Sequence, residues 1–208
     1  MSNTFYTVGH STHDIDKFIR LISQHGITTL CDVRSSPYSR MNPQFNRESL
    51  KQALREHGIG YVFLGKELGA RSNDPSCYVG GKVQYDRLAK TALFASGLEH
   101  VRDSMKTHKV ALMCAEKDPL ACHRTILVTR NLCAQGLSAQ HILEDGSVES
   151  HEQALSRLLH QLKLPEADMF RSREEWIEEA YAIQGKRIAY EEASADAHAV
   201  PVLNDSAT

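Results

Sequence analysis

Two thiols, an imidazole, a carboxylate and a guanidinium lie close together in one short segment of the chain. The segment reads CAEKDPLACHR and begins at Cys114. A thiolate is a nucleophile, an imidazole titrates near neutral pH, and a guanidinium binds anions. We therefore take Cys114 and Glu116 as candidate catalytic residues, and Cys122, His123 and Arg124 as candidate ligand-binding residues.

The middle of this segment has the pattern of a helix start. Asp118 suits the N-cap and Pro119 the first helical position. The N–H groups of residues 120–122 would then be free to bind an anion, with help from the helix dipole and from Arg124. We expect phosphate or sulfate to bind near residues 120–124, and we expect Arg124→Ala to weaken that binding by about tenfold or more.

Structural roles are also open for these residues. Cys122 shares a helical face with Ile126 and Cys133, which is the pattern of a buried structural thiol. Arg124 lies off that face and would otherwise be a solvated surface residue. Cys122 and His123 are adjacent, a spacing that rarely lets two residues bind one ion, so we assign no metal ligand and name no cofactor.

A second group of candidates follows two earlier apolar runs. His10 and Asp32 are candidate catalytic residues, since either can act as a base, and Arg34 and Ser35 are candidate anion ligands. The alternatives are a hydrogen-bonded structural histidine and an internal Asp32–Arg34 salt bridge.

Aromatic and basic residues are mixed in the loops beyond these runs. Tyr38 and Lys66 are candidate ligand-binding residues, and Arg71 adds positive charge to a glycine-rich segment at 65–83. Such mixtures suit nucleotides or single strands, although solvated loops often have the same composition.

The apolar patterns predict alternating strands and helices. Strands are expected at residues 5–8, 27–33, 61–64, 109–114 and 139–143. Helices are expected at residues 11–26, 46–58, 84–105, 118–136, 149–162 and 170–190, the first with Ser11 and Asp14 as a capping box.

This alternation predicts an α/β fold with a Rossmann-like, mostly parallel sheet flanked by helices. We expect one domain over residues 1–190 and a disordered tail over 191–208. Ligands of such sheets bind at the carboxyl ends of the strands, so the side chains of His10, Asp32, Arg34, Cys114 and Arg124 should border one pocket. The segment 65–83 should form a wall or lid of that pocket.

The composition restricts the classes of protein to which the chain can belong. It has 208 residues, 41% of them hydrophobic and 24% charged, with a net charge of −2, so charge alone gives no reason to expect nucleic-acid binding. No apolar run is long enough for a membrane span and no signal peptide is visible. The five cysteines contain no C-x-x-C pair and indicate a reducing compartment, so we expect a cytoplasmic protein without a membrane partner.

Several uncommon motifs occur together in this chain. They are VGHST, DVRSSPYSR, NPQFN, FLGKELG and CAEKDPLACHR. In this order they resemble the bacterial family catalogued as domain of unknown function 488, over roughly residues 5 to 190. The resemblance supports the α/β fold and implies no activity.

Three kinds of function remain open at this point. The first is an enzyme that acts on a phosphorylated or nucleotide-like ligand, including one within nucleic acid. The second is a non-catalytic module that binds a nucleotide or nucleic acid. The third is a metal or redox protein that uses its cysteines.

Overall fold

The strongly apolar segments of the chain form one central sheet. The computed structural model describes residues 3–192, and within them a six-stranded sheet has the order β3-β2-β6-β1-β7-β8. The strands are β1 (Thr4–Gly9), β2 (Thr29–Asp32), β3 (Gly60–Phe63), β6 (Val110–Cys114), β7 (Ser138–Ile142) and β8 (Val148–Ser150). All neighbouring pairs are parallel except β7 and β8. The predicted mostly parallel α/β sheet is therefore confirmed.

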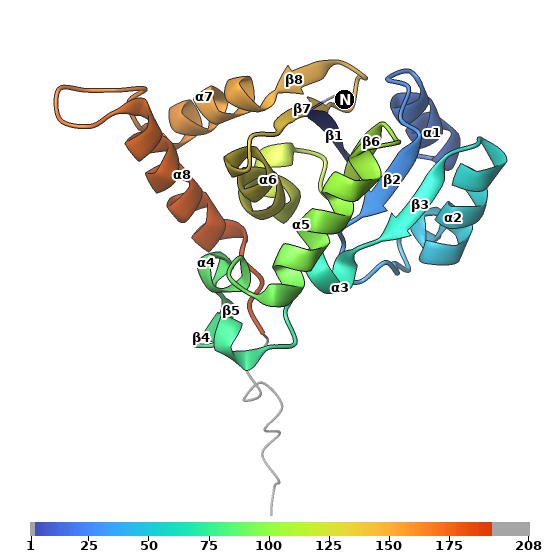
Figure 1. Ribbon diagram of the computed structural model, residues 1–208, viewed down its shortest axis with the longest axis horizontal. Helices are drawn as coiled ribbons and strands as arrows, with labels where there is room; N and C mark the ends of the chain where they lie inside the picture. The colour runs from blue at the N-terminus through green and yellow to red at the C-terminus, as the bar shows by residue number, and fades with distance from the viewer. Residues whose placement is uncertain (1–2, 193–208) are drawn as a thin grey trace, which may run out of the picture.

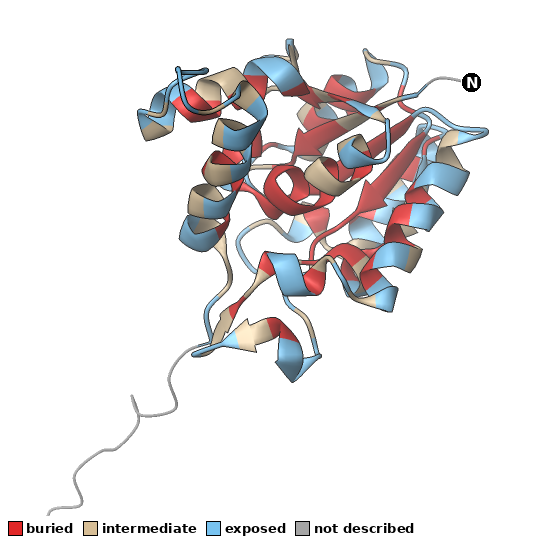
Figure 2. Cartoon of the chain, turned by 60° about the vertical axis from the view of Figure 1, so that its left-hand side comes forward, coloured by how far each residue is buried: buried red, intermediate tan, exposed pale blue. Residues whose placement is uncertain are grey.

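Helices cover both faces of this sheet (Figure 1). On one face α1 (Ile15–Ser23) and α2 (Arg47–Glu56) pack on one apolar cluster. The other face carries α5 (Ala92–Met105), α6 (Arg130–Ala134), α7 (His151–Leu162) and α8 (Arg173–Ile188). Figure 2 shows the strands buried between the two layers, with the outer sides of the helices exposed.

Two neighbouring strands at the centre of the sheet, β1 and β6, continue into helices on opposite faces. The chain leaves β1 through α1 on one face, and it leaves the neighbouring β6 towards α6 on the other. Backbone bonds from His10 N to the Cys114 carbonyl and from Ser11 N to the Ala115 carbonyl, both 2.9 Å, join the two chains just past the strands. Ligands of open α/β sheets bind at such a point.

The predicted helix at 118–136 is wrong in its first half. Asp118 does cap a turn, because its carboxylate accepts a hydrogen bond from Leu120 N. That turn is a single 3₁₀ turn, Pro119–Ala121, and Cys122 is extended, with φ −135° and ψ 139°. A π-helical segment, Arg124–Thr129, follows and leads into α6. Such segments are rare and often lie at functional sites.

Other boundaries also differ from the prediction. The first helix begins at Ile15 with Asp14 alone as its cap, because Ser11 adopts φ 50° and does not belong to the helix. The predicted helix at 84–105 is split into α4 (Tyr85–Leu88) and α5, since Thr91 caps α5. The predicted helix at 149–162 starts two residues later, because β8 extends to Ser150.

The glycine-rich segment at 65–83 contains short regular elements. They are α3 (Gly65–Leu68), a 3₁₀ turn (Pro75–Cys77) and a hairpin of β4 (Tyr78–Val79) and β5 (Lys82–Val83). The chain after α8 runs beside this hairpin, because Val83 N donates to the Tyr190 carbonyl and Lys82 pairs with Glu191. Of the tail expected at 191–208, the part from 193 onwards lies outside the described residues.

Among residues 3–192, no helix combines the length and the apolar composition needed to cross a membrane.

Candidate functional site

Two thiols and an imidazole meet at the carboxyl end of β6. Cys114 is the last residue of that strand, and its Sγ lies 3.7 Å from His123 Nδ1. The Sγ of Cys122 lies 3.9 Å from the same nitrogen. These three ligand atoms all lie within 4.8 Å of one another, and all three residues are buried. We call Cys114, Cys122 and His123 the thiol–imidazole cluster.

The orientation of the imidazole is fixed from the opposite side of the ring. His123 Nε2 lies 3.0 Å from the carbonyl oxygen of Val33, the residue that follows β2. Because a carbonyl only accepts, Nε2 carries a proton and donates it. Nδ1 therefore faces both sulfur atoms, either as a lone pair or as a second N–H.

The charges within the cluster are strongly coupled. Burial opposes the ionisation of Cys122, but a hydrogen bond from Cys114 and the charges of Arg124 and His123 outweigh it, so the pKa of Cys122 is lowered. The hydrogen bond with Cys122 and burial raise the pKa of Cys114, and the Cys122 sulfur raises the pKa of His123 against the effect of burial. These shifts make Cys122 the more acidic of the two thiols and favour the protonated form of His123 beside it.

A carboxylate adjoins the cluster. Glu116 Oε2 accepts a hydrogen bond from Cys122 Sγ at 3.0 Å. Glu116 is exposed as a whole residue, but the surrounding protein desolvates its carboxylate. This desolvation and the negative charge of the Cys122 sulfur raise the pKa of Glu116. A carboxyl group of this kind is suited to proton transfer.

Arg124 is fully buried, contrary to the alternative of a solvated surface residue. Its guanidinium donates to the carbonyls of Glu116, at 2.6 Å, and Lys117, at 3.2 Å. These two hydrogen bonds fix the backbone of the turn after β6.

The N–H groups of residues 120–122, which were expected to bind an anion, all donate hydrogen bonds within the turn. Leu120 N donates to the Asp118 side chain, and the N–H groups of Ala121 and Cys122 donate to the carbonyls of Asp118 and Pro119. The expected anion site at residues 120–122 therefore lacks its donors.

Asp32 and Arg34 form a buried ion pair, the second of the two roles considered for them. The carboxylate accepts from Arg34 Nε at 2.9 Å and Nη2 at 2.7 Å, and from the Tyr61 hydroxyl at 2.8 Å. Arg34 Nη1 also donates to His10 Nε2 at 3.2 Å. His10 stacks on Phe45 with 4.3 Å between ring centroids, and burial lowers its pKa to about 4, so the ring is neutral.

A cavity of about 300 Å³ opens between the ends of β2 and β6. Its lining includes five of the predicted site residues, which are Arg34, Ser35, Cys114, Glu116 and His123. Three more, His10, Asp32 and Cys122, lie directly behind this lining through the contacts described above. Tyr38, Lys66 and Arg124 do not line the cavity, and Tyr38 is 61% exposed. Of the five side chains expected to border one pocket, Arg34 and Cys114 line this cavity, whereas His10, Asp32 and Arg124 do not.

Tyr85 and Tyr190 line the cavity although the sequence did not predict them there, and Arg71 lies in the segment at 65–83 that was expected to form a wall. Arg71, Tyr85 and Tyr190 come from the glycine-rich segment, from α4 and from the chain after α8. Arg71 lies over the Tyr190 ring, 4.2 Å from its centroid. Ala70 and Arg71 make the segment at 65–83 a wall of the cavity. The only sequence signal for this wall was its length and glycine content.

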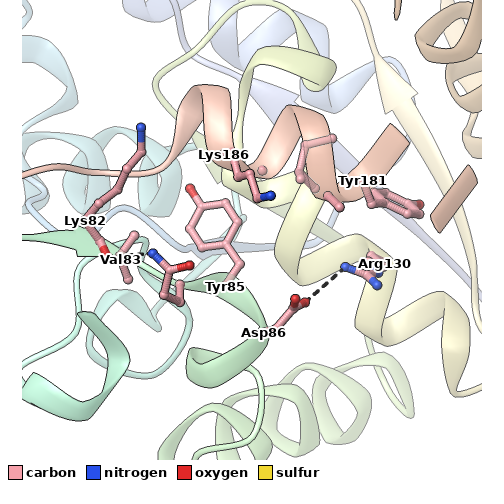
Figure 3. Close-up of a pocket in the computed structure, with 11 residues that line it drawn as sticks. Lys82, Val83, Tyr85, Asp86, Arg130, Tyr181 and Lys186 are labelled. Atoms are coloured by element: carbon pink, nitrogen blue, oxygen red, sulfur yellow. Dashed lines mark hydrogen bonds and ion pairs between the residues drawn. The ribbon is translucent and has the colours of Figure 1, made fainter. Parts of the chain in front are cut away.

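Tyr85 separates this cavity from a smaller one of about 80 Å³ beneath α8. In the smaller cavity Asp86 and Arg130 form an ion pair at 3.6 Å, and the Tyr85 hydroxyl points away from it (Figure 3). The hydroxyl is buried and has no hydrogen-bond partner among the described residues. Burial and the nearby Cys122, Cys114 and Glu116 raise the pKa of Tyr85, so it remains a neutral donor.

The site therefore combines a thiol–imidazole cluster, a carboxylate, a guanidinium and a phenol without a hydrogen-bond partner among residues 3–192 around one cavity. The comparisons with curated proteins and with solved structures found no match. The sequence model of one family, described as "Domain of unknown function DUF488", matches residues 14–130, which contain Asp32, Arg34 and the whole thiol–imidazole cluster. Because the match covers more than half of the 208 residues, the chain belongs to the DUF488 family.

Proposed function

We propose that this protein is an enzyme that acts on a small phosphorylated ligand held in the cavity between β2 and β6. The observation that carries the proposal is the Tyr85 hydroxyl, which is buried without a partner and borders the same cavity as Cys114 and His123. A buried donor without a partner costs about 1–3 kcal/mol, and a ligand that accepts its hydrogen bond recovers that cost. Such a group indicates that the cavity is shaped for a polar ligand.

Arg71 gives the cavity its preference for an anion. Its guanidinium stacks on Tyr190 and takes part in no ion pair within residues 3–192. Stacking uses the face of the group and leaves its N–H edge free, which is the edge that binds phosphate oxygens. Arg34 adds positive charge on the opposite wall, although Asp32 neutralises much of it.

The size of the cavity limits the ligand. Sites for small molecules usually occupy about 300–1,000 Å³, so a cavity of about 300 Å³ suits a sugar phosphate or a mononucleotide and is too small for a dinucleotide.

The titratable groups favour catalysis over simple binding. Cys114, Cys122, His123 and Glu116 all have shifted pKa values and all lie within or beside the lining of the cavity. Such clusters are typical of sites that move protons or form bonds. A module that only bound phosphate would gain nothing from the buried thiols.

Binding can be tested by calorimetry with inorganic phosphate, sugar phosphates and mononucleotides. We expect Tyr85→Phe to weaken binding about three- to tenfold and Arg71→Gln about tenfold or more, because each loses one hydrogen-bonding group. Arg55→Gln is the control, since Arg55 is exposed on α2 on the other face of the sheet. Equal affinity in all four proteins, or no binding of any ligand at millimolar concentration, would refute the proposal.

Catalysis requires a separate measurement. Phosphate release from each ligand that binds should be followed for the wild-type protein and for Glu116→Gln. We expect the variant to bind the ligand with little change in affinity and to lose turnover, because the amide cannot accept a proton. Binding without turnover in the wild-type protein would identify a binding module instead.

A further inference from the structure

We propose that Cys114, Cys122 and His123 bind a zinc ion whose fourth position opens into the cavity. The proposal rests on the arrangement of these three side chains and does not depend on the phosphorylated ligand.

The distances within the cluster are those of a tetrahedral zinc site. Zinc binds sulfur at about 2.3 Å and nitrogen at about 2.0–2.1 Å, which places the sulfur and nitrogen ligands about 3.6 Å apart. The two sulfur atoms lie 3.7 and 3.9 Å from His123 Nδ1. All three ligand atoms fall within 4.8 Å, so one ion can reach them with only small adjustments.

The adjacent positions of Cys122 and His123 argued against a shared ion in the sequence. The break in the predicted helix removes that objection. Cys122 is extended after the 3₁₀ turn while His123 already has helical angles, φ −60° and ψ −25°, and this change of direction brings both side chains to Cys114.

The hydrogen bond behind His123 has the form seen at metal sites. A histidine that binds zinc through one nitrogen usually donates its other N–H to a carbonyl or carboxylate, which fixes the ring. His123 Nε2 donates to the Val33 carbonyl at 3.0 Å and directs Nδ1 at the sulfur atoms.

The chemistry of the donors selects the metal. Thiolate and imidazole ligands favour zinc over magnesium or calcium, which prefer oxygen. A divalent cation would also balance the two buried thiols and the Glu116 carboxylate, which lies 3.0 Å from Cys122 Sγ. When zinc binds, each thiol that is still protonated releases its proton to solvent.

The place of two of the ligands on the cavity wall points to an open fourth position. Cys114 and His123 line the cavity, while Cys122 lies behind them. Three protein ligands with a fourth position left for water or substrate are the arrangement of catalytic zinc sites. Glu116, on the same wall, is placed to accept a proton from a water molecule in that position.

The test is a titration of chelator-treated, fully reduced protein with Co²⁺, whose absorption reports tetrahedral geometry and the number of thiolate ligands. We expect one Co²⁺ per chain, displaced by one Zn²⁺, with a charge-transfer band of two thiolates. Cys114→Ser and Cys122→Ser should each halve the intensity of that band. Each should also weaken Co²⁺ binding by about 100-fold or more, because the loss of a ligand lowers metal affinity at least as much as the loss of a residue that only orients a ligand.

Cys133→Ser is the matched control, because Cys133 is a free thiol on α6 outside the cluster, and it should change neither the band nor the affinity. Circular dichroism verifies that each serine variant is folded. The wild-type titration decides the matter even if a variant does not fold. Absence of a thiolate band in reduced wild-type protein, or a band that persists unchanged in Cys114→Ser, would overturn the proposal. Both outcomes leave the phosphate-binding experiment unaffected.

Discussion

Arg34, which lines the cavity, donates two hydrogen bonds of 2.9 and 2.7 Å to the carboxylate of Asp32. Asp32 is completely buried and Arg34 is 6% exposed. The desolvation of two buried charges offsets much of their mutual attraction, so the ion pair adds little to the free energy of unfolding. Its main effect is to fix the guanidinium at the end of β2, where Nη2 also donates to the Phe45 carbonyl at 2.9 Å.

Removing only one member of this pair should be strongly destabilising. Asp32→Asn leaves a buried guanidinium without its counter-charge, and we expect the free energy of unfolding to fall by about 3–5 kcal/mol. The double variant Asp32→Asn/Arg34→Met should lose much less than the sum of the single changes, because no unpaired charge is left. Urea denaturation of the three variants measures this coupling, and simple additivity would contradict it.

Gly9 should be intolerant of any side chain. A Cβ at this position would lie 1.9 Å from the Glu116 carbonyl oxygen, which Arg124 already contacts from the other side. We expect Gly9→Ala to cost about 1–3 kcal/mol or more, because β1 and the turn after β6 must separate.

The comparison for this change is Gly185→Ala, in the middle of α8. A Cβ there would meet its nearest neighbour at 3.5 Å, an ordinary contact. Alanine is the better helix former, so this variant should gain up to about 1 kcal/mol. Thermal and urea unfolding of both variants decide the matter, and a harmless Gly9→Ala would mean that the two segments are not in contact.

The sheet could be predicted because its signal is local and repeated. Each parallel strand is an apolar run followed by polar residues, and that pattern depends little on tertiary contacts. The register then brings distant strand ends together, since Gly9 lies opposite Cys114 and Asp32 opposite Met113. For this reason Arg34 and Cys114 were assigned correctly to one edge of the sheet. The alternation of strands and helices did not determine that β6 lies between β2 and β1.

The rest of the site depends on contacts that have no local signature. Tyr85 and Tyr190 reach the cavity from segments that are positioned only by packing between the hairpin and α8. The 3₁₀ turn at Pro119–Ala121 is also contacted from a distant segment, because Gln184 Nε2 on α8 donates to the Leu120 carbonyl at 2.8 Å. A regular helix would have placed Arg124 off the apolar face, where its expected partner was a ligand or the solvent.

Arg124→Leu separates the structural role from the predicted role in anion binding. We expect the free energy of unfolding to fall by at least about 2 kcal/mol, since two buried carbonyls lose charged donors. Arg87→Leu is the control, because the exposed Arg87 also donates to a carbonyl, that of Ser76, and should cost about 0.5 kcal/mol or less. If Arg124 instead bound anions, the variant would keep its stability and lose about tenfold in phosphate affinity.

A chain of hydrogen bonds crosses the core on the side of α7. His141 Nδ1 lies 2.8 Å from the Thr7 hydroxyl, His141 Nε2 lies 3.1 Å from His151 Nδ1, and His151 Nε2 lies 2.8 Å from the Tyr181 hydroxyl. Burial lowers the pKa of His151 to about 4, against a smaller opposing effect of Glu152, and it lowers that of His141 as well. Both rings are therefore neutral in the folded protein near neutral pH.

The free energy of unfolding should decrease at acid pH because of these buried, neutral histidines. In the unfolded protein His151 titrates near its ordinary pKa of about 6.5. Between that pH and about 4 the unfolded state binds a proton that the folded state does not, so the free energy of unfolding decreases as the pH falls through this window. The loss in the free energy of unfolding attributable to His151 alone is about 3 kcal/mol.

Urea denaturation from pH 7 to pH 4 measures this loss. The free energy of unfolding should decline less steeply for His151→Gln than for the wild-type protein, while His108→Gln, at an exposed position, should follow the wild type. Parallel curves for His151→Gln and the wild type would mean that His151 already carries its proton in the folded protein.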